Sequence, residues 1–364
     1  MSLTHYILDF AYTFNTCINC FPTPSLHINN RSYKIQRLLG EVGGFSYVYL
    51  VQASNGEYFA LKKIRCPFGA ESLQHAMKEI DSYKIFNDEH IINIIDSNVV
   101  QERDGSKTVY ILLPYFRRGN LQDTINANLI NHAHYDEREA LQLFLEIARG
   151  VRVMHKHRVD EDSGLNTRRA GNNTLEFERE SQPLMDDQGV TPVTSMSNLL
   201  PSGGAVVPYS HRDIKPANIM LSQTGVPVLM DLGSCTRARI EVASRQQALE
   251  LQDYAAEYCT ISYRAPELFD VKTNSVLDEG VDIWSLGCTY FALLYCSSPF
   301  ELQSSESGAS LSLAIINGQY RFPEAPKYTE RTKDVIRACL TVDPKHRPDI
   351  DRVILMVQGA LQQF

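Results

Sequence analysis

Positive charge is not in excess in this chain of 364 residues, because 35 Lys and Arg face 43 Asp and Glu, giving a net charge of −8. A pervasive basic surface is therefore not expected, which argues against nucleic acid as the main partner. Trp occurs only once, and the eight Cys residues are dispersed along the chain. A long chain with scattered Cys is not a disulfide scaffold, so reduced thiols are expected.

Long hydrophobic runs are also scarce. The most apolar window, residues 281–300, contains Asp282 and several Ser and Thr residues, so a buried core helix is a better interpretation than a membrane span. No secretory signal is expected near the start, because the first Lys or Arg is Arg31. Cys17 and Cys20 are the one close pair, and no second CxxC or nearby His pair completes a zinc site.

The first part of the chain is patterned like a β-sheet with one helix. Five strands are predicted, at residues 33–38, 47–51, 58–61, 91–96 and 108–113. Asn55-Gly56, a dipeptide typical of hairpin turns, joins the second and third. Apolar residues at Leu73, Met77 and Ile80 have helical spacing, which predicts a helix packed on this sheet.

The second part is patterned like a helical lobe. Residues 139–155 form an amphipathic helix, and helical patterning returns from Glu241. Between them, residues 160–207 carry one aromatic residue and scattered polar and acidic residues, a composition that predicts a disordered insert. The expected organisation is a leader at 1–30, followed by a domain at 31–364 with a small lobe at about 31–114 and a large lobe at about 115–364.

Several motifs indicate where the chemistry lies. Glycines at Gly40, Gly43 and Gly44 separate the first two strands, where backbone N–H groups can approach phosphate oxygens closely. Lys62 ends the third strand, and Glu79, on the predicted helix, is a candidate ion-pair partner for it. Taken alone, the glycines fit an ordinary turn and the two charges fit an ordinary surface.

The decisive run is His211-Arg212-Asp213-Ile214-Lys215-Pro216-Ala217-Asn218, which is followed by Asp231-Leu232-Gly233 and then by Ala265-Pro266-Glu267. Preceded in order by a glycine loop and a strand Lys, this set resembles the signature of the eukaryotic protein-kinase family. The resemblance runs from about Tyr33 to the C-terminus, excluding 160–207. It implies an α+β fold of two lobes: a small antiparallel β-rich N-lobe with one main helix, and a larger α-helical C-lobe.

The resemblance also implies roles for individual residues. Asp213 would accept the proton of the substrate hydroxyl, and Lys215 would steady the γ-phosphate, which points to Ser and Thr substrates. Lys62 would hold the α- and β-phosphates of ATP while Glu79 clamps it.

Hard oxygen ligands for Mg²⁺ would come from Asn218 and Asp231. Leu113 would be the gatekeeper behind the adenine, whose edge would bond to the backbone of Pro114 and Phe116. The expected nucleotide contacts are Gly40, Gly43, Gly44, Val48, Ala60, Lys62, Leu113, Pro114, Phe116 and Met220.

Two further family features have counterparts here, and one feature departs from the family. Asp282 resembles the buried helix Asp that braces the catalytic loop, and Glu267 and Arg347 resemble a structural ion pair. The glycine loop, in contrast, is one residue longer than in the family, with Val42 apparently inserted and Ser46 at the third glycine position. Its geometry over the phosphates is therefore not given by the resemblance.

The activation segment indicates a particular branch of the protein-kinase family. It spans residues 231–267, and residues 241–258 are predicted to form a helix where most kinases have an irregular loop. With the runs GGFSYV, LLPYFRRGNL and CTISYRAPELF, it resembles the Numb-associated kinases, in the branch of serine/threonine-protein kinase 16 and its fungal vacuolar-membrane relatives. That resemblance implies a small, acylated, autophosphorylating kinase on the cytosolic face of vacuole or Golgi membranes.

The leader fits this implication in part. Myristoylation requires Gly after the initiator Met, and Ser2 stands there. Cys17 and Cys20, between Phe14 and Phe21, remain candidate palmitoylation sites, with two unmodified thiols as the alternative.

Two other functions are alternatives to that of an active protein kinase. A pseudokinase scaffold at internal membranes is disfavoured because Lys62, Asp213, Asn218 and Asp231 are all present. A small-molecule kinase is disfavoured by Lys215-Pro216 and by the segment that ends at Ala265-Pro266-Glu267.

Overall fold

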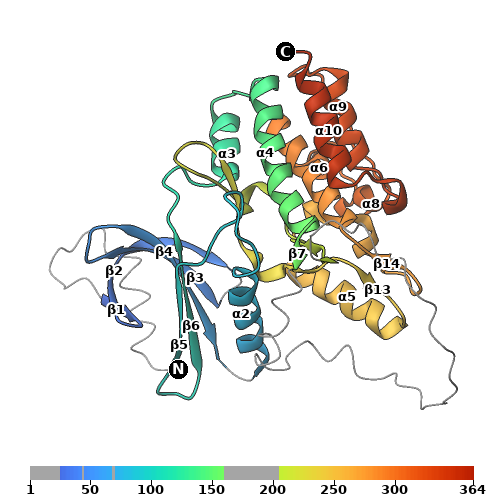
Figure 1. Ribbon diagram of the computed structural model, residues 1–364. Coiled ribbons are helices and arrows are strands. Elements are labelled where there is room, and N and C mark those ends of the chain that lie inside the picture. Colours follow the sequence, from blue (N-terminus) through green and yellow to red (C-terminus); the bar gives the residue numbers. More distant parts are fainter. Residues whose placement is uncertain (1–24, 43–44, 68–69, 160–204) are drawn as a thin grey trace, which may run out of the picture.

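A computed structural model describes residues 25–42, 45–67, 70–159 and 205–364. Within these ranges the chain folds into a small lobe built on one β-sheet and a larger lobe built mainly from helices (Figure 1). This is the bilobal α+β architecture that the sequence predicted.

The small lobe is one antiparallel sheet of six strands in the order β1-β2-β3-β4-β6-β5. The strands are β1 (Ser25–Ile28), β2 (Arg31–Val42), β3 (Ser46–Ala53), β4 (Tyr58–Cys66), β5 (Asp96–Gln101) and β6 (Lys107–Pro114). The turn between β3 and β4 contains Gly56 at a φ of +88°, which a residue with a Cβ rarely adopts. The hairpin predicted from Asn55-Gly56 is confirmed.

Two strand predictions need correction. The strand predicted at 91–96 is wrong, because β5 starts at Asp96 and residues before it contact the large lobe, where Ile92 N–H donates to the Leu229 carbonyl at 2.9 Å. A short apolar run does not distinguish a strand from a buried connection. β1 was not predicted at all and lies within the expected leader; Ile28 is fully buried there.

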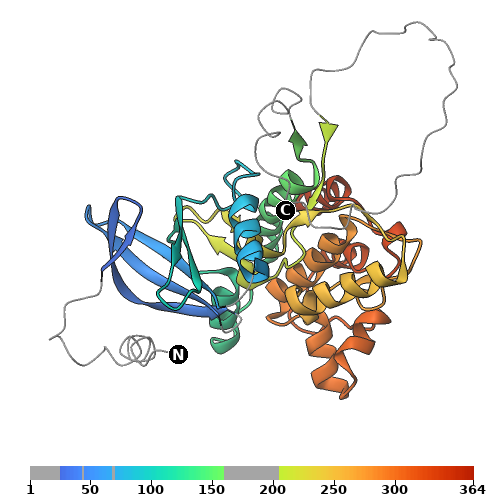
Figure 2. The same cartoon turned by 90° about the horizontal axis from the view of Figure 1, so that it is seen from below.

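Helix α2 (Ala70–Ser82) is the one main helix of the small lobe in the described part of the chain, and it lies between the sheet and the helical lobe (Figure 2). Of the three apolar residues with helical spacing, Ile80 is buried and Leu73 is half-buried, but Met77 is exposed and Ala76 is buried instead. Tyr83, just beyond the helix end, is buried as well. The inner side of α2 therefore faces the junction of the two lobes.

The large lobe is arranged around α6 (Gly280–Tyr295), whose residues from Val281 to Tyr295 are all buried. The prediction of a core helix at this apolar window is confirmed, and none of the described helices is long and apolar enough to cross a membrane. Around α6 lie α3 (Leu121–Ile130), α4 (Glu137–His155), α7 (Pro299–Ser307), α8 (Leu311–Ile316), α9 (Glu330–Cys339) and α10 (Ile350–Leu361). Phe144 of α4 stacks on Tyr290 of α6, with ring centroids 4.1 Å apart.

Short strand pairs shape the loops of the large lobe. They are β7 (Arg158–Val159) with β8 (Ala205–Val206), β9 (Tyr209–Ser210) with β12 (Thr236–Arg237), β10 (Ile219–Leu221) with β11 (Pro227–Leu229), and β13 (Ile240–Glu241) with β14 (Val276–Leu277). The insert predicted at residues 160–207 ends too late, because Ala205 and Val206 form β8, which pairs with β7. Residues 160–204 lie outside the described part of the chain.

The predicted activation-segment helix is present as α5 (Arg245–Tyr258), four residues shorter than expected at its start. Glu241 pairs with Val276 in a strand instead, and Ser244 caps the helix by accepting a hydrogen bond from the backbone N–H of Gln247. Ser is a strong N-cap residue, so the helix begins directly after it.

Candidate active site

Lys62 of β4 is held between two carboxylates. Its Nζ lies 2.6 Å from Oε1 of Glu79 on α2 and 3.1 Å from Oδ1 of Asp231, and its side chain is only 10% exposed. Burial alone would lower the pKa of Lys62, but the charges of Asp231 and Glu79 outweigh it and raise that pKa. The ammonium is therefore positively charged at neutral pH, as a phosphate-binding group must be.

A second residue, besides Lys62, contacts the carboxylate of Glu79. The hydroxyl of Tyr83 donates to Oε1 of Glu79 at 2.9 Å, so this carboxylate accepts from both Lys62 and Tyr83. The three residues are buried together where α2 meets the sheet and the large lobe. Sequence reasoning missed Tyr83, although it lies four residues after Glu79, the spacing of neighbours on a helix face.

Asp213 lies in the loop after β9, and its carboxylate is fixed on three sides. Oδ2 accepts from Lys215 Nζ at 2.7 Å and from Asn218 Nδ2 at 2.9 Å, and Oδ1 accepts from the backbone N–H of Thr260 at 2.9 Å. Lys215 also donates to the Thr260 hydroxyl at 2.6 Å. The carboxylate therefore has a single orientation, tied to the end of the activation segment.

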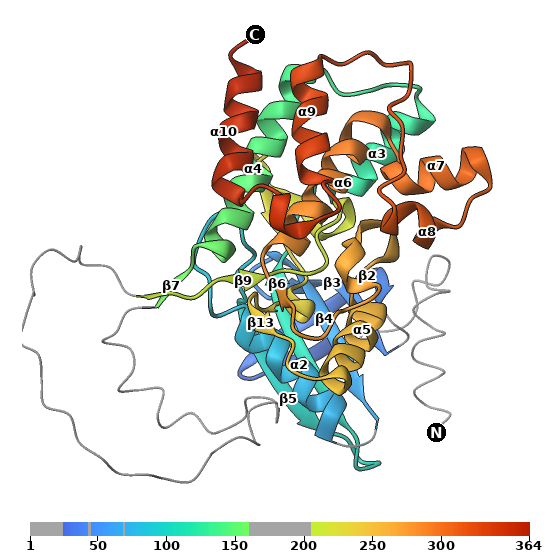
Figure 3. The ribbon, with the colours of Figure 1, turned by 90° about the vertical axis from the view of Figure 1, so that its right-hand side faces the viewer.

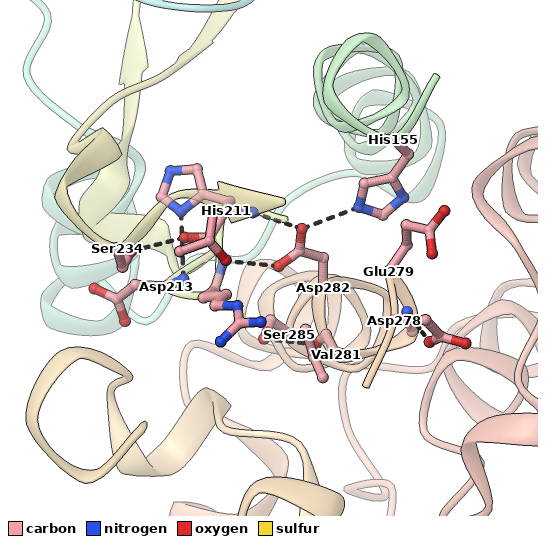
Figure 4. A network of polar contacts seen from close by, with 12 residues as sticks. His155, His211, Asp213, Ser234, Asp278, Glu279, Val281, Asp282 and Ser285 are labelled. Carbon is pink, nitrogen blue, oxygen red and sulfur yellow. Dashed lines mark hydrogen bonds and ion pairs between the residues drawn. The ribbon is translucent and has the colours of Figure 1, made fainter. Parts of the chain in front are cut away.

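Asp282 braces this loop from beneath (Figure 4). Its carboxylate accepts from the backbone N–H groups of His211 and Arg212, both at 2.8 Å, and lies 3.0 Å from Nε2 of His155 on α4. Arg212 has a φ of +67°, a strained conformation for a residue with a side chain, which persists only where neighbours enforce it. The bracing role predicted for Asp282 is thus confirmed by its contacts.

The charge of Asp282 is maintained although the residue has no exposed surface. Burial would raise its pKa, but the hydrogen bond from His155 and the nearby imidazoles of His155 and His211 hold the pKa below its usual range. His155 was missed from the sequence, because the last residue of an amphipathic helix more often points to solvent. Its place on the buried stripe of α4 was the available signal.

Asn218 and Asp231 present oxygen atoms on neighbouring segments. The backbone carbonyl of Asn218 accepts from the N–H of Met230 at 2.9 Å, which places the residue beside the start of the Asp231-Leu232-Gly233 run. Its Nδ2 is used by Asp213, so its Oδ1 is the atom left to bind a cation. The Lys62 ammonium holds the pKa of Asp231 below its usual range against the effect of burial, so this carboxylate is ionised.

The side-chain oxygens of Asn218 and Asp231 are suited to binding Mg²⁺. In the described ranges no three His, Cys, Asp or Glu side chains gather into an all-protein metal site. Mg²⁺ does not require one, because it is usually held by one or two protein oxygens together with substrate phosphates and water. The donor set is therefore compatible with a cation that arrives with a nucleotide.

The predicted adenine contacts lie where the two lobes meet. Leu113 pairs with Ala60 across β6 and β4, and Leu113 is 4% exposed, as a residue behind a ligand would be. Val48, Ala60 and Met220 are apolar yet only partly buried, so each keeps some surface that a ligand could cover. Pro114 and Phe116 follow at the end of β6, in the connection to the large lobe.

The glycine loop is only partly described. Gly40 lies in β2 opposite Val48, and a Cβ added at Gly40 would meet nothing within 4 Å. Val42 also belongs to β2 and pairs with Ser46, while the register shifts between Leu38 and Gly40. β2 therefore carries a bulge just before Gly40. Gly43 and Gly44 lie outside the described residues.

The remaining family features are also present. Arg347 donates two hydrogen bonds to Glu267, at 2.8 and 3.1 Å, which confirms the predicted ion pair. The six Cys residues in the described ranges are free and buried, in agreement with reduced thiols. Burial raises the pKa of Cys235 and of Cys259 to about 12, so both stay protonated. Cys17 and Cys20 lie outside the described residues.

Comparison with known proteins agrees with this geometry. Residues 33–160 and 208–356 match the protein kinase domain. Serine/threonine-protein kinase ENV7 of Saccharomyces cerevisiae is 41% identical over 94% of this chain and 95% of its own. Serine/threonine-protein kinase ppk13 of Schizosaccharomyces pombe is 36% identical over 95% of each chain, and human serine/threonine-protein kinase 16 is 34% identical over 91% of each. The resemblance predicted from the motifs is confirmed, and this chain belongs to the protein kinase family.

Proposed function

We propose that this protein is a serine/threonine protein kinase that transfers the γ-phosphate of ATP to Ser and Thr hydroxyls of protein substrates and of itself. The observation that carries the proposal is the Asp213 carboxylate, held by Lys215, Asn218 and the Thr260 N–H, at a lobe junction where Lys62 is ion-paired with Glu79. A charged phosphate-binding group and an oriented proton acceptor are the two protein parts that phosphoryl transfer requires.

Each group has a definite task in this proposal. Asp213 accepts the proton of the attacking hydroxyl and orients it, because the free lone pairs of its fixed carboxylate define one direction of approach. Lys215, 2.7 Å from Asp213, neutralises charge on the transferred phosphoryl group. Lys62 holds the α- and β-phosphates, and Glu79 keeps its ammonium in place. Mg²⁺, held by Asn218 and Asp231, would neutralise the charge on the phosphates.

The test uses the purified full chain with γ-labelled ATP and MgCl₂. We expect label on the chain itself, with hydrolysis of the labelled protein releasing phosphoserine or phosphothreonine. Label on tyrosine alone would overturn the Ser/Thr assignment. A chain that incorporates no label with Mg²⁺ or Mn²⁺, on itself or on casein, would favour the pseudokinase scaffold instead.

We further propose that the kinase works at the cytosolic face of vacuole or Golgi membranes, in membrane trafficking or in the organisation of these compartments. The resemblance to the branch of serine/threonine-protein kinase 16 supports this site of action, together with Cys17 and Cys20 as candidate palmitoylation sites. One acyl chain gives reversible binding, whereas two give stable anchoring, at about 0.8 kcal/mol per buried CH₂.

Substitution of both thiols is expected to release the protein from membranes. Cys17→Ser/Cys20→Ser should move most of the kinase to the soluble fraction, while phosphotransfer in solution stays at the wild-type rate. Hydroxylamine, which cleaves thioesters, should release the wild type to the same extent. Equal membrane association of the variant and the wild type would remove the acylation proposal and leave the kinase assignment untouched.

Replacement of residues 160–204 by Asn-Gly is expected to preserve both folding and phosphotransfer. Arg158 pairs with Val206 and Val159 pairs with Ala205, so the two ends of the segment already lie one strand spacing apart. A two-residue turn suits such a pair, and a shorter loop closes at a smaller entropic cost. We expect a melting temperature equal to or slightly above that of the wild type; insoluble protein would show that the segment packs on the domain.

A further inference from the structure

The activation-segment helix α5 lies beside α2 of the small lobe (Figures 1 and 3). Two pairs of side chains join the two helices. The His75 ring of α2 stacks on the Tyr258 ring of α5, with centroids 5.2 Å apart and an angle of 19° between the planes. One turn away, Nζ of Lys78 lies 5.3 Å from the centre of the Tyr254 ring and 3.4 Å from its hydroxyl. Both are contacts of large side chains between α2 and the activation segment, and they add to the Lys62–Asp231 ion pair and the Ile92–Leu229 hydrogen bond that also join the two lobes.

These contacts lie on the face of α2 that carries the catalytic ion pair. His75, Lys78 and Glu79 are spaced by three and four residues, so they are neighbours on one side of the helix. Glu79 lies one residue after Lys78 and contacts Lys62 at 2.6 Å. A rotation of α2 that separated His75 and Lys78 from α5 would therefore also withdraw Glu79 from Lys62.

On the other side, α5 is tied to the catalytic loop. The Tyr254 hydroxyl donates to the backbone carbonyl of Ser234 at 3.3 Å, and the Ser234 hydroxyl donates to the carbonyl of His211 at 2.7 Å. Tyr254 and Tyr258 pack on each other with centroids 4.6 Å apart. A continuous chain of contacts thus joins α2 to the loop that carries Asp213, and it needs no modified residue.

We propose that Tyr254 and Tyr258 are positioning residues: they hold α2 in the orientation in which Glu79 pairs with Lys62, and they do so without a phosphate on the activation segment. Ring stacking and a cation–π contact together are expected to shift the equilibrium between two orientations of α2 by about tenfold. The proposal rests on the proposed kinase function, because its readout is phosphotransfer.

The main test compares two double variants of α5. Tyr254→Ala/Tyr258→Ala removes both rings, whereas Tyr254→Phe/Tyr258→Phe keeps the rings and loses only the hydroxyls. We expect the first to lower kcat for autophosphorylation at least tenfold. The second keeps the rings against α2 but loses the hydrogen bonds of the Tyr254 hydroxyl with Ser234 and Lys78, so its rate should lie between those of the first variant and the wild type. Leu249→Ala is the matched control on the same helix, because Leu249 is 43% exposed and should leave the rate unchanged.

A variant on α2 separates positioning from general damage to α5. His75→Ala/Lys78→Ala should lower kcat to a similar degree, and joining it to Tyr254→Ala/Tyr258→Ala should cause little further loss, because both remove the same contacts. Amide hydrogen exchange should quicken in residues 72–82 of either variant and stay unchanged in α6. Losses that multiply independently, with unchanged exchange in α2, would overturn the proposal.

The last experiment uses the wild-type protein. After treatment with a phosphatase, its initial rate should stay within about twofold of the untreated rate, since the contacts need no phosphate; loss of activity would assign the positioning to a phosphorylated residue and overturn the proposal. An inactive wild type would instead contradict the proposed function. A soluble Tyr254→Ala/Tyr258→Ala variant with wild-type kcat would contradict the positioning role alone.

Discussion

Replacing Asp213 with Asn is expected to abolish measurable autophosphorylation while the protein stays folded. The Asn amide cannot accept a proton from the substrate hydroxyl, and general-base catalysis by a positioned carboxylate contributes about 10²- to 10⁴-fold. Its one oxygen can still accept from the Thr260 N–H, while Lys215 and Asn218 lose their acceptor. The side chain is buried but does not belong to the hydrophobic core, so the fold should persist. The rate of label incorporation from γ-labelled ATP measures the effect.

Asp253→Asn is the matched control for this experiment. Asp253 is an exposed carboxylate on α5, so the same chemical change there should leave the rate unchanged. Circular dichroism and thermal unfolding confirm that each variant is folded. Label incorporated by Asp213→Asn at the wild-type rate would contradict its role as the proton acceptor.

Replacing Asp282 with Ala is expected to cause the largest loss of stability of any single substitution in the site. The carboxylate accepts from two backbone N–H groups and interacts with His155, and removing it leaves these buried donors without a partner. Each buried donor left without an acceptor costs about 1–3 kcal/mol. Arg212 would then be free to leave its strained backbone conformation, so phosphotransfer should fall as well.

The free energy of unfolding, measured in urea, provides the test. Asp334→Ala is a suitable control, because Asp334 forms an ion pair with Arg337 on the surface of α9, where both side chains are about half exposed. Pairs of that kind contribute about 0–1 kcal/mol. A loss for Asp282→Ala no greater than that for Asp334→Ala would show that the bracing contacts do not stabilise the domain.

The long helices were predictable from sequence, because the spacing of their apolar residues indicates which sides of the helix are buried. The stripe of α4 and the uniformly apolar α6 predicted one half-buried and one fully buried helix, and both are present. Short elements were less predictable: β5 lies after the apolar residues that suggested it, and β1 has only four residues. In both cases, contacts with distant parts of the chain decide the local conformation.

For the candidate site, the motifs identified the residue types but not their supports. Lys62, Glu79 and Asp231 come from distant segments, and their meeting followed from the family resemblance rather than from any local pattern. Tyr83 and His155, which hold the charged residues in place, belong to no short motif.

The contacts of α5 show the same limit. The sequence predicted a helix there, but periodicity gives no information about a partner in the small lobe. Tyr258 stacks on His75 across a separation in sequence that only the folded chain brings together.

The pairing of β7 with β8 also makes this protein suitable for carrying a foreign domain. The chain leaves the large lobe at Val159 and returns at Ala205 through adjacent strands, so the two ends of any segment placed between them are held close together. Many folded domains have neighbouring termini, and the entropic cost of closing a loop rises only slowly with its length. A fluorescent reporter inserted between β7 and β8 would therefore label the kinase internally, leaving both the N-terminal segment with its cysteines and the C-terminal helix α10 unaltered.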